Sequence, residues 1–116
     1  MTNQEVFDKV VAHLKAQGKQ SLKGDSCKYR GSMGMKCAVG CLIPDEEYSS
    51  ELEGKTVRSP ELVNLPSLRH LNLELLWDLQ GVHDRCDPPN WETKLLKVAK
   101  RFKLKMESLD DKSRNL

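Results

Sequence analysis

Residues 68–86 of this 116-residue chain read LRHLNLELLWDLQGVHDRC, and the spacing of their apolar side chains decides the fold class. Apolar residues recur at steps of three and four, as on one face of an amphipathic helix; they are Leu68, Leu71, Leu75, Leu79 and Val82. We expect a helix that begins near Ser67. Continued by four residues, the same stripe reaches Cys86, although Gly81 weakens this last turn by about 1 kcal/mol relative to alanine. Two prolines at 88–89 end the pattern.

Amphipathic helices are also predicted at the two ends of the chain. The first opens with Thr2 and Glu5 in a capping-box arrangement, continues with valines and a leucine at helical spacing, and stops at Gly18. The last covers residues 91–104, where apolar side chains alternate with lysines at helical spacing. Asn90 is a suitable N-cap for this helix.

The region between the first helix and residue 68 is less regular. Glycines punctuate residues 18–36 and predict a hairpin in which residues 27–30 pair with residues 35–37. A proline followed by three acidic residues predicts a second helix over residues 44–52. Residues 37–43 fit either a short buried helix or an apolar strand, and both alternatives stay open.

These elements predict a mainly α fold: a single compact domain of about four helices, with a small β-hairpin between the first and second. The domain covers residues 1–105 and is long enough for a modest core without disulfides or metals. We expect residues 106–116 to form a polar, flexible tail. The predicted core consists of Val10, Leu14, Leu42, Leu68, Leu71, Leu75, Leu79, Leu95 and Phe102.

The composition is that of a soluble globular protein, with 38% hydrophobic and 31% charged residues. No apolar run approaches the roughly 20 residues that cross a bilayer, so we expect no membrane span. The N-terminus lacks a basic region followed by an apolar stretch, so we expect no secretory signal and a cytoplasmic location. Cysteines are reduced there, which disfavours a disulfide framework for the four cysteines.

Charge is unevenly distributed although the net charge is only +2. Lys and Arg outnumber Asp and Glu by four in residues 1–43 and again in residues 91–116, whereas the acids are in excess by six in residues 44–90. Such asymmetry can steer a charged partner, or the acidic middle can lie against the basic ends. Nucleic-acid binding is disfavoured, because aromatics are few and the acidic middle would repel phosphate.

The cysteines raise the question of a metal site. Cys37 and Cys41 are four residues apart, which places both on one face if the segment is helical. Cys27 could join them through the hairpin, and His83 or Cys86 could supply a fourth ligand. Zinc takes four such nitrogen or sulfur donors. The spacing Cys-x9-Cys-x3-Cys nevertheless lacks the paired cysteines of structural zinc sites, so the pattern favours no cofactor.

A catalytic thiol is the second possibility. Cys37 or Cys41 with His83 as base, oriented by Asp84, is the set to consider. His83 and Asp84 are consecutive, however, and the side chains of consecutive helical residues point about 100° apart, which disfavours Asp84 as the group that orients His83. The sequence also carries no signature of a thiol enzyme. Free cysteine packs as a small hydrophobe, and the apolar run at 38–43 would carry Cys41 into the core. Burial is therefore the favoured role.

Charged and aromatic side chains near the predicted hairpin and second helix are candidates for partner recognition. A solvated acidic helix face and a salt bridge within the hairpin are the simpler explanations for them. The candidates are Tyr29, Arg30, Asp45, Glu46, Glu47 and Glu51.

Three stretches, CKYRGSMGMKCAVGCLIPDEEY (27–48), LLWDLQGVHDRCDPPNW (75–91) and LLKVAKRFKL (95–104), resemble a group of short uncharacterised proteins of bacteriophages and bacteria. The likeness covers most of residues 3–104, and the Cys-x-Tyr-Arg and Lys-Cys-Ala-Val-Gly-Cys-Leu-Ile-Pro-Asp segments are its specific markers. The resemblance transfers no activity and no functional residue. It implies a phage or mobile-element setting, in which small accessory proteins often bind and inhibit host proteins.

The sequence therefore favours a small non-enzymatic binding protein, in particular a phage-encoded inhibitor of a host or anti-phage defence protein that acts through charged surface patches. Its location would then be the cytoplasm of the host cell. The alternative is a zinc- or thiol-dependent enzyme centred on Cys37 and Cys41 with His83. The sequence names neither the partner nor the oligomeric state.

Overall fold

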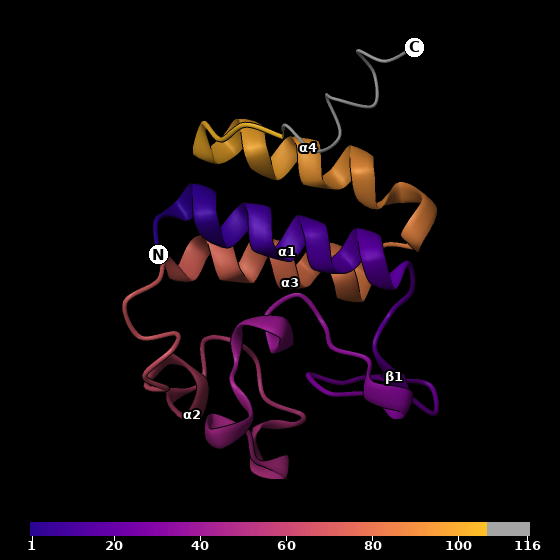
Figure 1. The fold of residues 1–116 in the computed structure, drawn as a ribbon, viewed down its shortest axis with the longest axis vertical. Coiled ribbons are helices and arrows are strands. Elements are labelled where there is room, and N and C mark those ends of the chain that lie inside the picture. The colour runs from indigo at the N-terminus through magenta and orange to yellow at the C-terminus, as the bar shows by residue number, and fades with distance from the viewer. Residues whose placement is uncertain (107–116) are drawn as a thin grey trace.

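Four α-helices and one two-stranded hairpin make up the fold (Figure 1) of a computed structural model that describes residues 1–106. The helices are α1 (Asn3–Gln17), α2 (Pro60–Val63), α3 (Leu73–Arg85) and α4 (Trp91–Phe102), and the strands are β1 (Leu22–Lys23) and β2 (Ser26–Cys27). Short 3₁₀ turns lie between them at η1 (Ser32–Gly34), η2 (Gly40–Leu42), η3 (Asp45–Glu47), η4 (Ser50–Leu52) and η5 (Pro88–Asn90). The prediction of a mainly helical domain with a small hairpin after the first helix is confirmed.

The three long helices lie side by side with roughly aligned axes (Figure 1). The hairpin, the turns η1 to η4 and α2 gather on one side of them, whereas η5 joins α3 to α4. α3 packs against both α1 and α4. The body measures 44 × 31 × 22 Å along its principal axes. None of the described helices has the length and apolar character needed to cross a membrane.

α1 follows the sequence prediction in detail. The Glu5 N–H donates to the Thr2 hydroxyl at 3.1 Å, and the Thr2 N–H donates to the Glu5 carboxylate at 2.8 Å, which completes the capping box. These hydrogen bonds hold the pKa of Glu5 below its usual value. The helix ends at Gly18, whose φ of 70° is the left-handed cap that glycine adopts most easily.

The predicted helix over residues 44–52 is wrong. The chain forms the separate turns η3 and η4 there, and the second α-helix is the single turn α2 further along. Between residues 44 and 52 only Leu52 is buried. A short segment without an apolar face has no tertiary packing to stabilise a helix, so the acidic residues stay in solvated turns.

A hairpin forms after α1, but the segments that pair in it are not the predicted ones. Leu22 pairs with Cys27, and the turn between β1 and β2 uses Gly24 at a φ of 64°. The expected pairing of residues 27–30 with 35–37 is reduced to one bridge between Arg30 and Lys36. Residues 37–43 form neither a regular helix nor a strand but a buried turn around η2.

The boundaries of the last two long helices also differ from the prediction. α3 begins after Asn72, whose side chain accepts from the Leu75 N–H at 3.1 Å, rather than near Ser67. It ends before Cys86, which has an extended backbone. At α4 the side chain of Asn90 makes no cap, because the preceding turn η5 already leads into the helix with Asn90 in a helical conformation.

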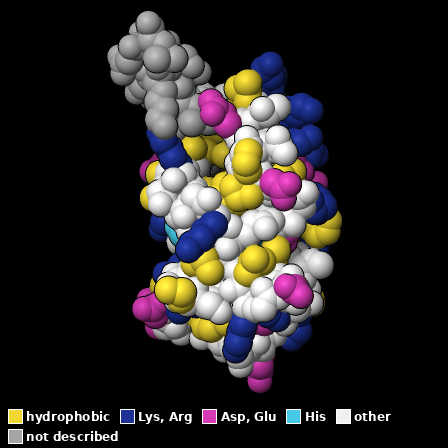
Figure 2. Space-filling view, turned by 90° about the vertical axis from the view of Figure 1, so that its right-hand side faces the viewer, with side chains coloured by type: hydrophobic (Ala, Val, Ile, Leu, Met, Phe, Trp, Pro, Cys, Tyr) yellow, Lys and Arg dark blue, Asp and Glu magenta, His cyan; other side chains and the backbone are white. Residues whose placement is uncertain are grey.

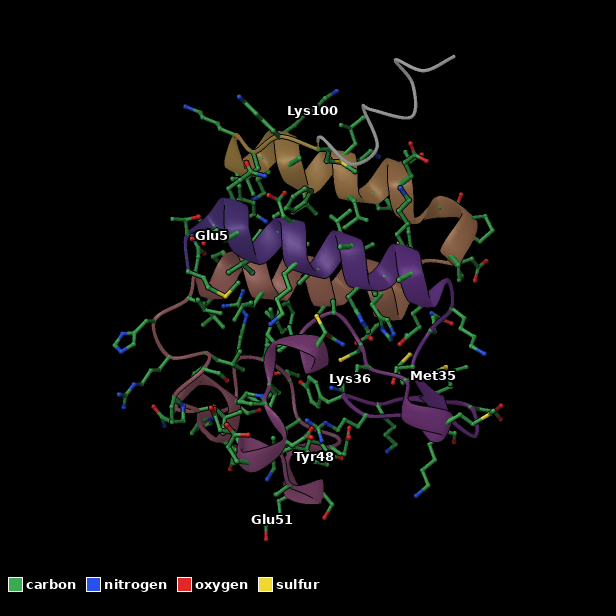
Figure 3. The ribbon with its side chains drawn as sticks, in the orientation of Figure 1. Glu5, Met35, Lys36, Tyr48, Glu51 and Lys100 are labelled. Carbon is green, nitrogen blue, oxygen red and sulfur yellow. The ribbon has the colours of Figure 1, made fainter. Side chains whose placement is uncertain are left out.

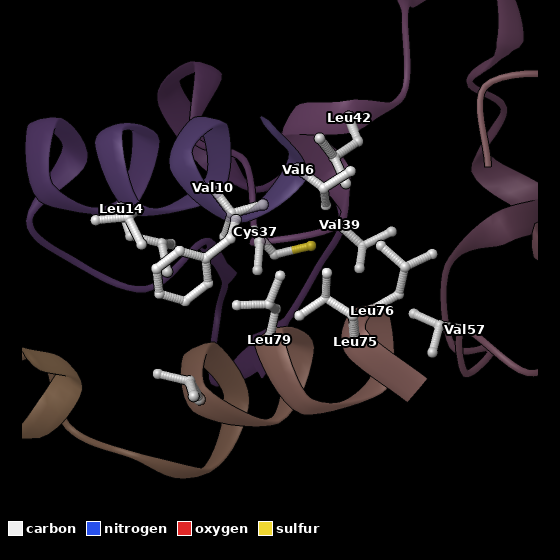
Figure 4. Close-up of a cluster of buried hydrophobic side chains, with 14 of the residues drawn as sticks. Val6, Val10, Leu14, Cys37, Val39, Leu42, Val57, Leu75, Leu76 and Leu79 are labelled. Carbon is white, nitrogen blue, oxygen red and sulfur yellow. The ribbon is translucent and has the colours of Figure 1, made fainter. Parts of the chain in front are cut away.

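The core lies mainly between α1 and α3, which point apolar side chains toward each other (Figure 4). The segment that contains Cys37 and Val39 fills the space between them. The predicted core is confirmed except for Leu71 and Phe102, which are only partly buried. Met106, assigned to the tail, is buried in the core, and residues 107–116 of the predicted tail lie outside the described part of the chain.

Candidate functional site

Reactive side chains from distant parts of the chain meet where the hairpin packs on the end of α3. Cys27 lies on β2, and His83 and Asp84 lie on the last turn of α3. One ligand atom from each of the three residues lies within 4.8 Å of the other two. Within residues 1–106 this is the one such group of His, Cys, Asp or Glu side chains. We call it the β2–α3 cluster.

His83 is fully buried and has both ring nitrogens occupied. The Ser21 N–H donates to Nε2 at 2.8 Å, and Nδ1 lies 2.6 Å from a carboxylate oxygen of Asp84. A backbone N–H can only donate, so Nε2 is the acceptor and Nδ1 carries the proton of the neutral ring. The hydrogen bonds thus assign one tautomer, with Nδ1–H donating to Asp84.

Asp84 also lies beside the thiol of Cys27. Its side chain is 35% exposed and also accepts from the Gln80 amide at 2.9 Å. Burial raises the pKa of Cys27, and the Asp84 charge and hydrogen bond raise it further. Since the thiolate is the nucleophile and the metal ligand, Cys27 is a poor candidate for either role at neutral pH.

The donor set of the β2–α3 cluster does not fit a zinc ion well. A histidine that bound zinc through Nδ1 would carry its proton on Nε2, directly opposite the Ser21 N–H, so two donors would face each other at 2.8 Å. Metal-bound histidines normally donate that second N–H to an acceptor. The separation of 2.6 Å between Nδ1 and Asp84 is also shorter than the roughly 3.3 Å expected between two tetrahedral zinc ligands.

The cysteines of the KCAVGC segment lie outside this cluster. Cys37 is fully buried, and its sulfur accepts from the Gly40 N–H at 3.2 Å. The thiol of Cys41 donates to the Ala38 carbonyl at 3.0 Å. Burial raises the pKa of both thiols, in Cys41 to about 11. The structure therefore does not bring Cys37 or Cys41 together with His83 in one group of potential ligands.

Two of the predicted recognition residues, Tyr29 and Arg30, make hydrogen bonds and contacts within the fold. Tyr29 is buried, with its hydroxyl donating to the Lys55 carbonyl. The Arg30 guanidinium donates to the Ile43 carbonyl at 3.1 Å, pairs with Asp45 at 2.7 Å and covers the ring of Tyr48 at 4.4 Å. Neither side chain is free to contact a partner without loss of these interactions.

The acidic recognition residues have different surroundings. The side chain of Asp45 is 84% exposed despite its ion pair, and Glu46 and Glu51 are exposed. Glu47 is half-buried and accepts from the Ser67 N–H at 3.0 Å. Asp45, Glu46 and Glu51 therefore form an acidic surface on η3 and η4.

Glu53 has a structural role that the sequence did not predict, since a carboxylate in this acidic segment was expected to lie on a solvated helix face. Its carboxylate accepts from the N–H groups of Tyr29 at 2.8 Å and Arg30 at 3.1 Å, and from the Tyr48 hydroxyl at 2.7 Å. Burial raises the pKa of Tyr48 to about 12, with a further contribution from the hydrogen bond and charge of Glu53. Two of these partners lie more than 20 positions away, so no local pattern reveals them.

A pocket of about 250 Å³ opens beside the β2–α3 cluster. One wall is the turn of α3 that carries Asp84 and Arg85. The guanidinium of Arg85 folds back over Gly81, where an added Cβ would lie 2.1 Å from it. The pocket is lined by both polar and apolar side chains, among them Cys27, Glu53, Trp77, Gln80, Asp84 and Arg85.

Charge is only partly neutralised within the molecule. Glu74 of α3 pairs with Arg58 at 3.0 Å, and Asp78 pairs with Arg101 of α4. The acidic surface, in contrast, lies at the opposite end of the long axis from α4: Glu51 and Lys100 mark the two ends in Figure 3. On the face in Figure 2, Lys and Arg gather along an upper edge, and hydrophobic side chains form small separate patches.

Comparisons of this chain with models of protein families, with curated proteins and with solved structures found no match.

Alkaline pH is expected to destabilise the protein through its buried thiols. The thiols of Cys37 and Cys41 ionise near pH 9 in the unfolded chain, whereas burial raises their pKa in the folded state. Above pH 9 the folded state therefore binds more protons than the unfolded state, and the free energy of unfolding falls by up to about 1.4 kcal/mol per pH unit for each such thiol.

Urea unfolding between pH 7 and 10.5, in the presence of a reductant, measures this effect. The free energy of unfolding should be insensitive to these thiols up to about pH 8.5 and then decline. A constant value up to pH 10.5 would contradict the burial of Cys37 and Cys41.

Proposed function

We propose that this chain is a small non-enzymatic binding protein that recognises a partner protein through exposed charge. The observation that carries the proposal is the acidic surface on η3 and η4, whose carboxylates Asp45, Glu46 and Glu51 are exposed, at the end of the molecule opposite α4. An exposed surface of one charge accelerates encounter with an oppositely charged partner. The acidic surface of Asp45, Glu46 and Glu51 is the proposed contact region.

The state of the thiols supports a role without catalysis. Cys27 lies beside the Asp84 carboxylate, the Cys41 thiol donates to a carbonyl, and Cys37 is fully buried. His83 has both nitrogens in hydrogen bonds with the fold, so it is not available as a base for any of them. An activated nucleophile needs the opposite environment, with a lowered pKa or a free base beside it.

The partner that we propose is a host or anti-phage defence protein with a basic surface. The expected resemblance to short phage and bacterial proteins motivates this setting, and we propose that the interaction takes place in the cytoplasm of the host cell. A partner with a basic surface is complementary to the acidic surface, which nucleic acid is not.

A zinc- or thiol-dependent enzyme is the alternative, and the grouping of Cys27, His83 and Asp84 beside the pocket is the observation in its favour. An enzyme centred on Cys37 and Cys41 has less support, because the sulfurs of these two residues lie outside that group. Near-stoichiometric zinc in the purified protein, lost on Cys27→Ser, would favour this alternative over a binding protein.

The binding proposal is tested by charge reversal with a matched control. Glu46→Lys with Glu51→Lys should weaken capture of a bacterial partner at least tenfold at low salt, because it reverses the acidic surface. Asp25→Lys with Glu92→Lys changes the net charge by the same amount at exposed positions elsewhere and should leave capture within about twofold. Quantitative affinity capture from lysate, repeated at two salt concentrations, measures both variants. Equal capture by both would refute the acidic surface as the contact.

A further inference from the structure

The pocket beside the β2–α3 cluster is built by three segments that are distant along the chain. Residues 27–29 lie at the end of the hairpin, residues 53–57 follow η4, and residues of α3 between 77 and 85 form the third wall. Its volume of about 250 Å³ is just below the range of roughly 300–1,000 Å³ that is typical of sites for drug-sized ligands. The space therefore suits a small organic molecule. We call it the α3 pocket.

The two carboxylates that line the α3 pocket already have partners within the fold. Glu53 accepts from two backbone N–H groups and from the Tyr48 hydroxyl. Asp84 accepts from the Gln80 amide at 2.9 Å and lies 2.6 Å from Nδ1 of His83. Neither carboxylate therefore requires a cationic ligand to satisfy its oxygens.

The basic side chains of the same pocket have fewer partners. Lys28, Lys55 and Arg85 line it. Within residues 1–106, the Lys55 ammonium lies 3.7 Å from a Glu61 oxygen, and no ion pair includes Lys28 or Arg85. The charge that is available to a ligand is thus positive, which favours an anion.

Gly81 allows the Arg85 guanidinium to lie against α3. Apart from the helix backbone, the three atoms nearest to an added Cβ at position 81 all belong to this guanidinium. Glycine is unfavourable in the interior of a helix, yet any side chain here would push the guanidinium away. Both residues line the α3 pocket. The glycine therefore keeps a planar, forked hydrogen-bond donor beside the space for a ligand.

The α3 pocket also has an apolar wall. Val57 is buried and Trp77 is half-buried, and both line the pocket. The Arg58 guanidinium lies 4.5 Å from the centroid of the Trp77 ring and restrains it. Trp77 and Gly81 are one turn of α3 apart, which is about 6 Å along the helix axis. A molecule of that length can contact the Trp77 ring and the guanidinium over Gly81 together.

The position of the pocket along α3 favours an anion of low charge. The pocket lies at the C-terminal part of the helix, where the helix dipole is negative, and Asp84 adds a full negative charge. Phosphate groups bind preferentially at the opposite end of a helix, where backbone N–H groups are free. A carboxylate carries a single charge and matches the guanidinium fork with two parallel hydrogen bonds.

We propose that the α3 pocket binds a small organic monocarboxylate, with its carboxylate on the Arg85 guanidinium and its apolar part against Trp77. Lys28 and Lys55 add positive charge around the bound anion. The pocket is separate from the acidic surface on η3 and η4, so this inference does not rest on the proposed function. Failure of either one leaves the other standing.

Benzoate is the probe for this site, and benzamide is its uncharged control of the same shape. In an NMR titration of the isotope-labelled full chain, benzoate should give saturable shifts at residues that line the pocket, including the indole N–H of Trp77. Benzamide should bind at least about fivefold more weakly, because it forms no charge-assisted pair with Arg85. Phenyl phosphate should also bind more weakly than benzoate.

The titration has three outcomes that would overturn the inference. The first is the absence of saturable shifts with benzoate up to about 50 mM, which is weaker than the millimolar affinity expected of a small fragment. The second is equal affinity for benzoate and benzamide. The third is tighter binding of phenyl phosphate, which would assign the pocket to phosphate esters instead of carboxylates.

Two substitutions test the position of the charge. Arg85→Gln should weaken benzoate binding at least about tenfold, because hydrogen bonds between charged groups are the stronger kind. Gly81→Ala keeps the charge but displaces the guanidinium, and it should weaken binding at least about fivefold. The unfolding midpoint of Gly81→Ala in urea should equal or exceed that of the wild type, because alanine is the better helix former.

Arg69→Gln is the matched control, since Arg69 is an exposed arginine that does not line the α3 pocket. Its affinity for benzoate should stay within about twofold of the wild type. Wild-type affinity in Arg85→Gln would overturn the inference, and so would equal losses in Arg85→Gln and Arg69→Gln. Because Arg85 is exposed, its substitution keeps the test decisive even if Gly81→Ala is less stable than the wild type.

Discussion

Gly40→Ala is expected to destabilise the fold by at least about 3 kcal/mol, because the added methyl group would enter the space of a buried backbone. A Cβ at position 40 would lie 2.1 Å from the Tyr29 carbonyl oxygen and 2.9 Å from its carbon. Tyr29 cannot move away easily. Its carbonyl accepts from the Cys37 N–H at 3.3 Å, and its own N–H donates to Glu53 at 2.8 Å.

Gly18→Ala is the matched control for this substitution. Gly18 has a φ of 70°, but nothing lies within 4 Å of an added Cβ, so alanine there should cost only about 1 kcal/mol through the backbone. Urea denaturation of both variants gives the comparison. If Gly40→Ala is no less stable than Gly18→Ala, the close packing of the KCAVGC turn against Tyr29 is wrong.

Glu53→Gln is expected to lower the free energy of unfolding by about 2–3 kcal/mol. The carboxylate accepts hydrogen bonds from two consecutive N–H groups and from the Tyr48 hydroxyl. An amide of the same shape supplies one acceptor oxygen, while its NH₂ group would face another donor. Hydrogen bonds to a charged acceptor are the stronger kind, and an unsatisfied donor adds its desolvation cost.

The experiment compares Glu53→Gln with Glu51→Gln, which neutralises an exposed carboxylate nearby and should change stability by less than about 0.5 kcal/mol. Alkaline absorbance titration of Tyr48 provides an independent readout. Its pKa is raised to about 12 by burial and by Glu53, so loss of the Glu53 charge should lower it. Equal stability of the two variants would contradict the role of Glu53.

Local interactions made part of this fold predictable. The capping box of Thr2 and Glu5 and the left-handed cap at Gly18 depend on residues three or four positions apart, so the sequence shows them directly. The apolar stripes predicted that the long helices form and which of their faces is buried. The helix predicted over residues 44–52 failed because acidic residues after a proline satisfy local preferences without any apolar face to pack.

The candidate site was less predictable than the helices. The cysteines, His83 and the acidic residues were recognised as candidates, but the grouping of Cys27 with His83 and Asp84 depends on how the hairpin packs on α3. The pocket lined by Trp77 and Arg85 likewise depends on how residues 53–57 pack on α3. Periodicity carries no information about such contacts, because they join segments that are distant along the chain.

The amino-acid sequence by itself determined the helical class, the caps of α1 and the buried faces of the long helices, since these follow from interactions within about one helical turn. Only the tertiary structure decided which segments pair in the hairpin, the tautomer of His83, the buried partners of Glu53 and the position of the acidic surface opposite α4. Each of these depends on packing between elements, where burial sets the cost of an unpaired polar group.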